Sequence, residues 1–295
     1  MTSTPGPVKS WLLASRPKTL PAAAVPVVVG SAVAFGQQKF ALGPALAALA
    51  GAALIQIGTN FANDYFDAKS GADNENRLGP TRAVQAGLVT PNAMKWATVL
   101  AFLASALVGL YLIGVGGWPI LVIGILSILS GIAYTGGPYP LGYNGLGDVF
   151  VFIFFGLIAV TATHYVQALS FSVEALVASV PIGLLSTAIL IVNNYRDIDT
   201  DRVAHKNTLA VRLGRSATRK QYAITVLGAY AVPLAQVLAG LSSIWVLLPL
   251  LSLPLAFKNI RALARLEGPA LNPLLARTAG LLTLFGLLYA IGFTL

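Results

Sequence analysis

The sequence has no cysteine, only two histidines and few charged residues. Charged side chains make up 10% of its 295 residues, whereas an ordinary soluble domain has about 25%. The absence of cysteine excludes disulfide frameworks, thiolate metal sites and cysteine nucleophiles. The composition also argues against a water-soluble fold, because 56% of the residues are hydrophobic and the charged ones are too few to cover a soluble surface.

Nine apolar segments of near-spanning length occupy most of the chain. A transmembrane helix needs about 20 apolar residues, and each segment is continuous rather than alternating, as β-barrel strands would be. We therefore predict an all-α polytopic membrane protein with nine transmembrane helices, forming a single domain over residues 1–295. The predicted helices are Leu20–Phe35, Ala41–Ile57, Trp96–Val115, Trp118–Tyr134, Val149–Leu169, Val173–Val192, Tyr222–Leu241, Ile244–Phe257 and Leu274–Leu295.

The basic residues fall almost entirely in alternate loops. Of the 19 Lys and Arg residues, 18 lie in the N-terminal tail and in the loops after the second, sixth and eighth segments, and only Lys39 lies elsewhere. Loops rich in Lys and Arg stay in the cytoplasm, so the pattern predicts a cytoplasmic N-terminus. The net charge of +9 then reflects membrane topology, and no nucleic-acid partner is expected.

The acidic residues gather at two helix ends. Seven of the ten carboxylates follow the second and the sixth segments, at predicted cytoplasmic ends. Both groups contain an Asn-x-x-x-Asp spacing, which places the two side chains on one helical face. Such a polar face is costly in a membrane unless it meets a cavity or a partner. The spaced residues are Gln56, Asn60 and Asp64, then Asn63 and Asp67, and finally Asn193, Asp197 and Asp201.

Carboxylates that converge at a membrane edge need a counter-charge, and a divalent cation is the simplest one. Ligand sets of Asp, Asn and water oxygens favour Mg²⁺. Mg²⁺ completes its coordination shell with water and phosphate oxygens, so two acidic groups beside basic loops predict a diphosphate site. Alternatively, the acidic groups are solvated helix ends and the loop cations are topology signals alone. The basic candidates for the diphosphate are Lys69, Arg77, Arg82, Arg196, Lys206 and Arg212.

Four blocks of this sequence resemble the UbiA superfamily of intramembrane aromatic prenyltransferases, most closely its branch that acts on 1,4-dihydroxy-2-naphthoate. The first three are Ser15–Pro21, Asn60–Asp67 with its continuation to Arg82, and Tyr134–Asp148; the fourth is Asn193–Asp201 with its continuation to Gly214. The superfamily usually has a third acid four residues after Asp67. This chain has Gly71 there and its next acid at Asp73, a form that resembles the naphthoate branch.

The resemblance implies a helical bundle around a central cavity and transfer of a polyprenyl group from polyprenyl diphosphate to 1,4-dihydroxy-2-naphthoate. Diphosphate and CO2 would be lost, in a step of menaquinone synthesis at the inner membrane with the site facing the cytoplasm. It also implies two Mg²⁺ ions that stabilise the leaving diphosphate. The implied ligands are Asn60, Asp64 and Asp67 for one ion and Asn193, Asp197 and Asp201 for the other, with Asp73 as a further candidate.

The implied acceptor is an aromatic anion, so basic and aromatic residues near the acids are its candidate contacts. Arg16 and Lys18 precede the first helix and could attract a carboxylate, or could serve only to orient the helix. Tyr134, Tyr139 and Tyr143 lie in a Gly- and Pro-rich loop. Their rings could shield a carbocation or only sit at the interface. Tyr134 is a catalytic candidate, together with the metal-binding acids Asp64, Asp67, Asp197 and Asp201. Gln56 and Asn60 complete the candidate substrate contacts.

Two other functional classes share parts of this pattern. A prenyltransferase for another aromatic acceptor, 4-hydroxybenzoate or homogentisate, would carry the same acidic groups, and the choice of acceptor rests on the resemblance alone. A cation-coupled transporter would also carry membrane carboxylates, but usually near the bilayer midplane on broken helices. Membrane lipid is an expected partner, and the sequence leaves the prenyl chain length and the oligomeric state open.

Overall fold

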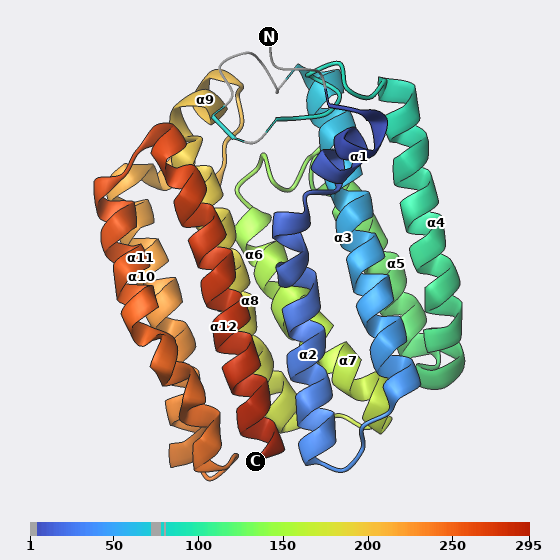
Figure 1. The fold of residues 1–295 in the computed structure, drawn as a ribbon, viewed down its shortest axis with the longest axis vertical. Helices are drawn as coiled ribbons and strands as arrows, with labels where there is room; N and C mark the ends of the chain where they lie inside the picture. Colours follow the sequence, from blue (N-terminus) through green and yellow to red (C-terminus); the bar gives the residue numbers. More distant parts are fainter. Residues whose placement is uncertain (1–4, 72–77, 80) are drawn as a thin grey trace.

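The structure is a computed structural model that describes residues 5–71, 78–79 and 81–295, and these residues form helices without strands. The long helices run side by side in one bundle, with α1 at the upper end and the C-terminus at the lower end (Figure 1). In chain order the elements are α1 (Pro7–Ser15), η1 (Pro17–Thr19), α2 (Leu20–Gly36), α3 (Leu42–Ser70), α4 (Pro91–Gly116), α5 (Trp118–Ala133), α6 (Gly147–Val151), η2 (Phe152–Ile158), α7 (Ala159–Ala168), α8 (Val173–Arg196), α9 (Ile198–Val203), α10 (Leu209–Leu238), η3 (Ile244–Ser252), α11 (Leu253–Arg265), η4 (Gly268–Leu271) and α12 (Asn272–Thr294).

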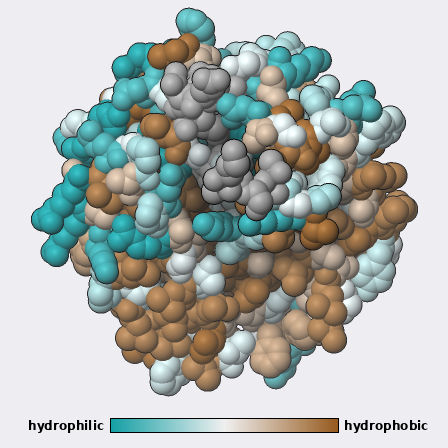
Figure 2. Space-filling view, turned by 45° about the horizontal axis from the view of Figure 1, so that its top comes forward, coloured by the Kyte–Doolittle hydropathy of each residue, from teal (hydrophilic) through white to brown (hydrophobic). Residues whose placement is uncertain are grey.

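Eight helical segments of the described chain are long and apolar enough to cross a membrane. The remaining apolar helix, α5, has 16 residues, which corresponds to about 24 Å. The predicted all-α, multi-pass membrane architecture is confirmed. Nine crossings and a cytoplasmic N-terminus stay predictions. In the space-filling view, hydrophilic side chains gather at the upper end and a broad hydrophobic surface covers the side below it (Figure 2).

The helix that follows the second acidic group begins earlier than its apolar stretch indicates. The sequence predicts a start at Tyr222, but helical structure begins at Leu209, where the Thr208 hydroxyl accepts a hydrogen bond from the Val211 N–H and caps the helix; a kink at Gly214, with φ 75° and ψ 171°, separates this first part from the rest of α10. Its first turns carry Arg212 and Arg215, and these charged residues keep the first turns out of the apolar stretch from which the helix was predicted. The prediction for this boundary was therefore wrong, because a capped amphipathic start carries no hydropathy signal.

The sequence predicts that the second acidic group lies on one continuous helix, but the structure divides it between two helices. Helix α8 ends at Arg196, and the backbone of Asp197 leaves the helical region with φ −96° and ψ 8°. Asp201 lies on the separate short helix α9. The polar face expected to carry Asn193, Asp197 and Asp201 is therefore broken at its middle residue.

Helix α8 is the most buried of the spanning helices, and two glycines let its backbone come close to that of η2. A Cβ atom added to Gly156 would lie 2.5 Å from the Cα atom of Gly183 on α8, a distance that no side chain tolerates. Gly156 belongs to η2, a π-helical turn of the kind that is frequent near functional sites. The two glycines thus let η2 pack directly against α8.

A polar cluster closes the lower end of the bundle. The His164 ring nitrogen Nε2 lies 2.8 Å from the Gln37 amide oxygen, and the Gln37 amide nitrogen donates to the Glu174 carboxylate at 3.0 Å. The Ser242 hydroxyl donates to the other oxygen of that carboxylate at 2.7 Å. These bonds join the end of α2 to α7, α8 and the loop after α10. The acidic groups lie at the opposite, upper end of the bundle.

Candidate functional site at the upper end of the bundle

Both acidic groups lie at the upper end, where α3 and α8 terminate (Figure 1). Helix α3 ends at Ser70 and is followed by Gly71, whose φ of 70° lies in the left-handed region that favours glycine. A glycine at position 71 adopts this conformation without steric strain. Among the described residues that follow, Arg82, Ala83 and Val84 return to α3 and contact its two aspartates.

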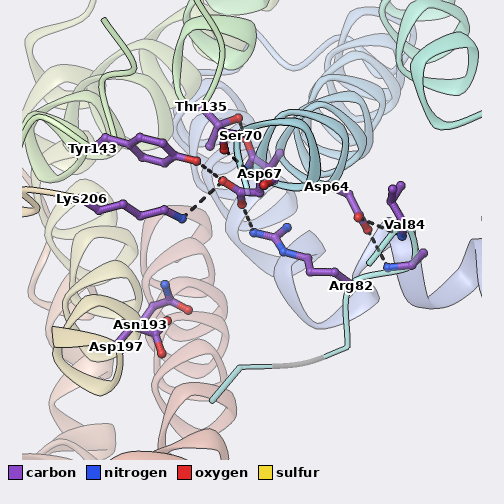
Figure 3. A network of polar contacts seen from close by, with 12 residues as sticks. Asp64, Asp67, Ser70, Arg82, Val84, Thr135, Tyr143, Asn193, Asp197 and Lys206 are labelled. Atoms are coloured by element: carbon purple, nitrogen blue, oxygen red, sulfur yellow. Dashed lines mark hydrogen bonds and ion pairs between the residues drawn. The ribbon is translucent and has the colours of Figure 1, made fainter. Parts of the chain in front are cut away.

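Asp67 is the centre of a buried polar network (Figure 3). Its carboxylate accepts hydrogen bonds from the Arg82 guanidinium and from the Tyr143 hydroxyl. The Lys206 ammonium lies 3.4 Å from the Asp67 oxygen Oδ1 and 4.4 Å from the centre of the Tyr143 ring. The network joins α3, the loop before α6 and the loop after α9, so it brings three of the sequence blocks together.

Asp64 lies one turn before Asp67 and has different partners. Its two carboxylate oxygens accept the backbone N–H groups of Ala83 at 2.9 Å and of Val84 at 3.1 Å. The side chain is buried. Asp64 therefore fastens the segment that carries Arg82, and it lies on the side of α3 that is turned toward α1.

The second acidic group is organised by Arg196, which is almost completely buried. Its guanidinium makes two hydrogen bonds to the Asp197 carboxylate, at 2.8 and 2.6 Å. It also donates to the amide oxygens of Asn193 at 2.9 Å and of Asn272 at 2.8 Å. The Asn272 amide nitrogen in turn donates to the Leu78 carbonyl at 3.0 Å, so one asparagine on α12 joins the second motif to the segment after the first.

The polar stripe predicted on α3 turns toward the N-terminal segment. The amide nitrogens of Gln56 and Asn60 donate to the Thr19 hydroxyl at 3.1 and 3.0 Å. Asn60 also donates to the Ser15 carbonyl at 3.0 Å. Arg16 lies between these two partners in the chain, with a left-handed backbone of φ 50°. The stripe thus fixes the turn between α1 and α2.

Tyr134 lies at the end of α5, among several acids. Burial raises the pKa of its phenol, and the charges of Asp148, Asp67 and Asp201 raise it further, so the phenol stays neutral. Asp148 is buried as well and accepts a hydrogen bond from the Gln221 amide at 2.5 Å. The sequence analysis assigned Asp148 no role beyond its place in a matched block. Its partner Gln221 lies on the distant helix α10, so no local pattern points to their contact.

An apolar cavity of about 470 Å³ lies between α2, α3, α4, α5, η2 and α7. Ala48 and Asn63, both on α3, line it, so it extends over about 22 Å of that helix. Its wall is mostly aliphatic and aromatic, whereas Gln56, Asn60 and Asn63 place amide groups at the end nearest the acids. Tyr134 also faces the cavity. An amphipathic ligand would find a polar end and an apolar channel in one site.

Some predicted site residues lie away from this network. Lys18, Lys69 and Tyr139 are exposed at the surface. Arg212 is also exposed and donates to the backbone carbonyls of Asn144 at 2.8 Å and Asn207 at 3.1 Å, so it holds two loops together. Asp73 and Arg77 lie outside the described residues.

Other residues of the site escaped the sequence analysis. The Thr135 hydroxyl donates to the buried Asn63 amide oxygen at 2.7 Å, and Asn272 lies on a helix outside the matched blocks. A spacing rule detects neighbours on one helix but not partners brought together by packing. These residues therefore carried no signal in the sequence.

Two of the candidate metal ligands, Asp67 and Asp197, are paired with basic groups. Within the described part of the chain, no three His, Cys, Asp or Glu side chains lie close enough to hold a metal ion together. Asp67 contacts Arg82 and Lys206, and Asp197 contacts Arg196. The carboxylate and amide oxygens present are nevertheless the donors that Mg²⁺ prefers, and a polyanion could bind the adjacent basic groups and release those oxygens.

Relatives of this chain are found among curated proteins. It is 40% identical over 291 residues to the 1,4-dihydroxy-2-naphthoate octaprenyltransferase of Escherichia coli (strain K12), with 96% of this chain and 94% of that protein aligned. It is 37% identical over 294 residues to the protein of the same name from Haemophilus influenzae, with 97% of this chain and 96% of that protein aligned.

The fold and the family model agree with these relatives. A solved UbiA homolog from Archaeoglobus fulgidus, bound to GPP and Mg²⁺, matches with a TM-score of 0.68 at 15% identity, covering 97% of this chain and 99% of that one. A model described as the UbiA prenyltransferase family matches residues 23–281. With that model spanning most of its length, and with relatives aligned from end to end, the chain belongs to the UbiA prenyltransferase family.

Proposed function

We propose that this protein transfers a polyprenyl group from polyprenyl diphosphate to 1,4-dihydroxy-2-naphthoate, with release of diphosphate and CO2, as a step of menaquinone synthesis. The observation that carries this proposal is the 40% identity, over nearly the whole length of both chains, to a protein named for that reaction. The arrangement of basic groups above an apolar cavity supports it, because the donor has a polyanionic head and an apolar tail.

The diphosphate would bind where the two motifs meet. Arg82, Lys206 and Arg196 are buried or nearly so, and each lies against a carboxylate. A diphosphate would attract these cations, and their charge would stabilise the negative charge that develops as the allylic C–O bond breaks. Burial strengthens this effect, because water does not screen the charges there.

Two Mg²⁺ ions would bind together with the diphosphate, and the acids and asparagines of the two motifs would hold them. Asn60, Asp64 and Asp67 are the proposed ligands of one ion, and Asn193, Asp197 and Asp201 those of the other. Bound Mg²⁺ would neutralise the leaving group. The Archaeoglobus fulgidus homolog of the same fold was solved with GPP and Mg²⁺, which supports the presence of the metal; the number of ions rests on there being two motifs.

The prenyl tail would lie in the cavity, and the acceptor would approach from the side of Arg16. The neutral Tyr134 phenol faces the cavity and could shield the allylic cation through its ring. The naphthoate ring would then attack the allylic carbon and lose its carboxylate as CO2. Because basic loops stay in the cytoplasm, the site would face the cytoplasm from the inner membrane.

Reconstitution tests this function directly. The purified protein in liposomes should convert octaprenyl diphosphate and carboxyl-labelled dihydroxynaphthoate, with Mg²⁺, into a prenylated naphthoquinol and labelled CO2. Turnover with 4-hydroxybenzoate or homogentisate, and none with the naphthoate, would refute the acceptor while sparing the reaction class. Failure with every acceptor would contradict the reaction itself.

A matched pair of variants tests the site in the same assay. Asp197→Asn should abolish turnover, whereas Asp199→Asn should retain it, because the Asp199 side chain is 67% exposed and pairs with surface arginines. Equal losses in both variants would argue against a special role for Asp197.

A further inference from the structure

A second pocket, which shares no lining residue with the apolar cavity, lies between α11 and α12 near their upper ends. Its volume is about 600 Å³. Four of its seven lining residues are basic, and none is acidic. The lining residues are Pro254, Phe257, Lys258, Arg261, Ala262, Arg265 and Arg277.

Helix α11 presents its basic side chains on its outer face. Phe257, Arg261 and Arg265 follow one another at i, i+4 spacing and are exposed together with Lys258, whereas Asn259 and Leu263 are buried against the bundle. From Lys258 to Arg265 the stripe covers about 10 Å along the helix axis. It therefore occupies the last turns of the spanning segment Ile244–Arg265.

Arg277 supplies the opposite wall of the pocket and has an unused donor. Its Nε atom is buried and has no hydrogen-bond partner among the described residues. The nearest acid in the chain after Arg265 is Glu267, which already pairs with Arg219 at 3.2 Å. A buried guanidinium N–H without a partner is costly, so an anion in this pocket would supply a missing interaction.

We propose that this pocket binds the headgroup phosphate of an anionic phospholipid such as phosphatidylglycerol. The phosphate would lie between Arg261 and Arg277, since arginine forks bind phosphate oxygens well. Basic pockets between transmembrane helices on the cytoplasmic side are suited to anionic headgroups.

The apolar residues of the pocket favour a lipid over a soluble anion. Phe257 is 46% exposed and, with Pro254, borders the basic stripe on the side of the membrane core. An acyl chain would cover both residues, whereas a free diphosphate would leave them bare. The pocket also lacks the carboxylate and amide oxygens that would hold a metal with a diphosphate.

Native mass spectrometry of the full-length protein can test this site. The protein would be released from nanodiscs made of equal parts of phosphatidylglycerol and phosphatidylcholine, and the bound lipids would be counted. In the triple variant Lys258→Gln, Arg261→Gln and Arg277→Gln, the preference for phosphatidylglycerol should fall at least about tenfold, since each basic side chain near an anionic lipid surface contributes about fivefold.

Two comparison variants separate a built site from diffuse charge and from misfolding. The triple variant Lys9→Gln, Lys95→Gln and Lys220→Gln removes the same charge from exposed positions elsewhere and should keep the preference. The double variant Arg261→Lys and Arg277→Lys keeps the charge and should retain most of it.

Three results would overturn the proposal. The pocket variant could keep the wild-type preference, or the comparison triple variant could lose as much. Inorganic diphosphate could also displace the bound phosphatidylglycerol from the wild type and from the comparison triple variant alike, which would make the pocket a site for a soluble anion.

Discussion

Replacement of Arg82 by methionine should separate the stability of the site from its chemistry. The Arg82 and Asp67 side chains are 7% and 2% exposed, and they form an ion pair. Breaking a buried pair costs about 3–5 kcal/mol when the remaining charge has no partner. Because Lys206 stays 3.4 Å from Asp67 and the Tyr143 hydroxyl still donates to it, we expect a smaller loss, of about 2–3 kcal/mol.

The double variant Asp67→Asn and Arg82→Met should recover part of this stability, because it removes both charges of the Arg82–Asp67 pair and leaves only Lys206, which is 11% exposed, without its carboxylate. Turnover should not recover. Loss of one preorganised cation at the leaving group should slow the reaction about 10²–10³-fold, and loss of the carboxylate should abolish it.

The assay is unfolding in mild detergent with increasing SDS, together with single-turnover prenylation. Arg202→Met is the matched control, because Arg202 is 62% exposed and its ion pair with Asp199 is 3.9 Å long; such a surface pair contributes about 0–1 kcal/mol. The reasoning would be refuted if Arg82→Met were no less stable than Arg202→Met, or if the double variant were no more stable than the single one.

Three further predictions concern the cavity, the bridge between the motifs and the metal. Gly109 and Gly124 line the cavity and have open space at the Cβ position. Gly109→Leu or Gly124→Leu should therefore reduce turnover of octaprenyl diphosphate but not of geranyl diphosphate. The control Gly114→Leu, at an equally open position outside the cavity, should affect neither donor. Asn272→Leu should cost about 1–3 kcal/mol of stability by leaving buried partners unsatisfied and should weaken donor binding measured by titration, and unchanged binding would contradict the bridge. EDTA should abolish turnover and added Mg²⁺ should restore it, whereas activity that survives chelation would rule out the metal.

The elements and the placement of the acids could be predicted from the sequence because each leaves a local signal. A continuous apolar stretch identifies a spanning helix, and a few membrane carboxylates at two helix ends identify a polar site. Arg82, Arg196 and Lys206 were candidates on these grounds, and all three contact acids of the motifs.

The rest depended on contacts between distant segments. Arg212 and Lys69 resemble Arg196 in the sequence, yet packing leaves them exposed. Asp64 is held by the backbone N–H groups of Ala83 and Val84, and backbone donors leave no trace in residue identity. Asn272 lies 76 positions after Arg196, where no periodicity connects them.

The central claim is that the two motifs bind one diphosphate together. A double-mutant cycle on the binding of farnesyl diphosphate with Mg²⁺ tests it most directly, using Asp67→Asn, Asp197→Asn and the double variant in titrations. If both acids serve the same ligand, each single variant should lose most of the affinity and the double variant should lose little more. Losses that add, or a single variant that binds like the wild type, would contradict the account.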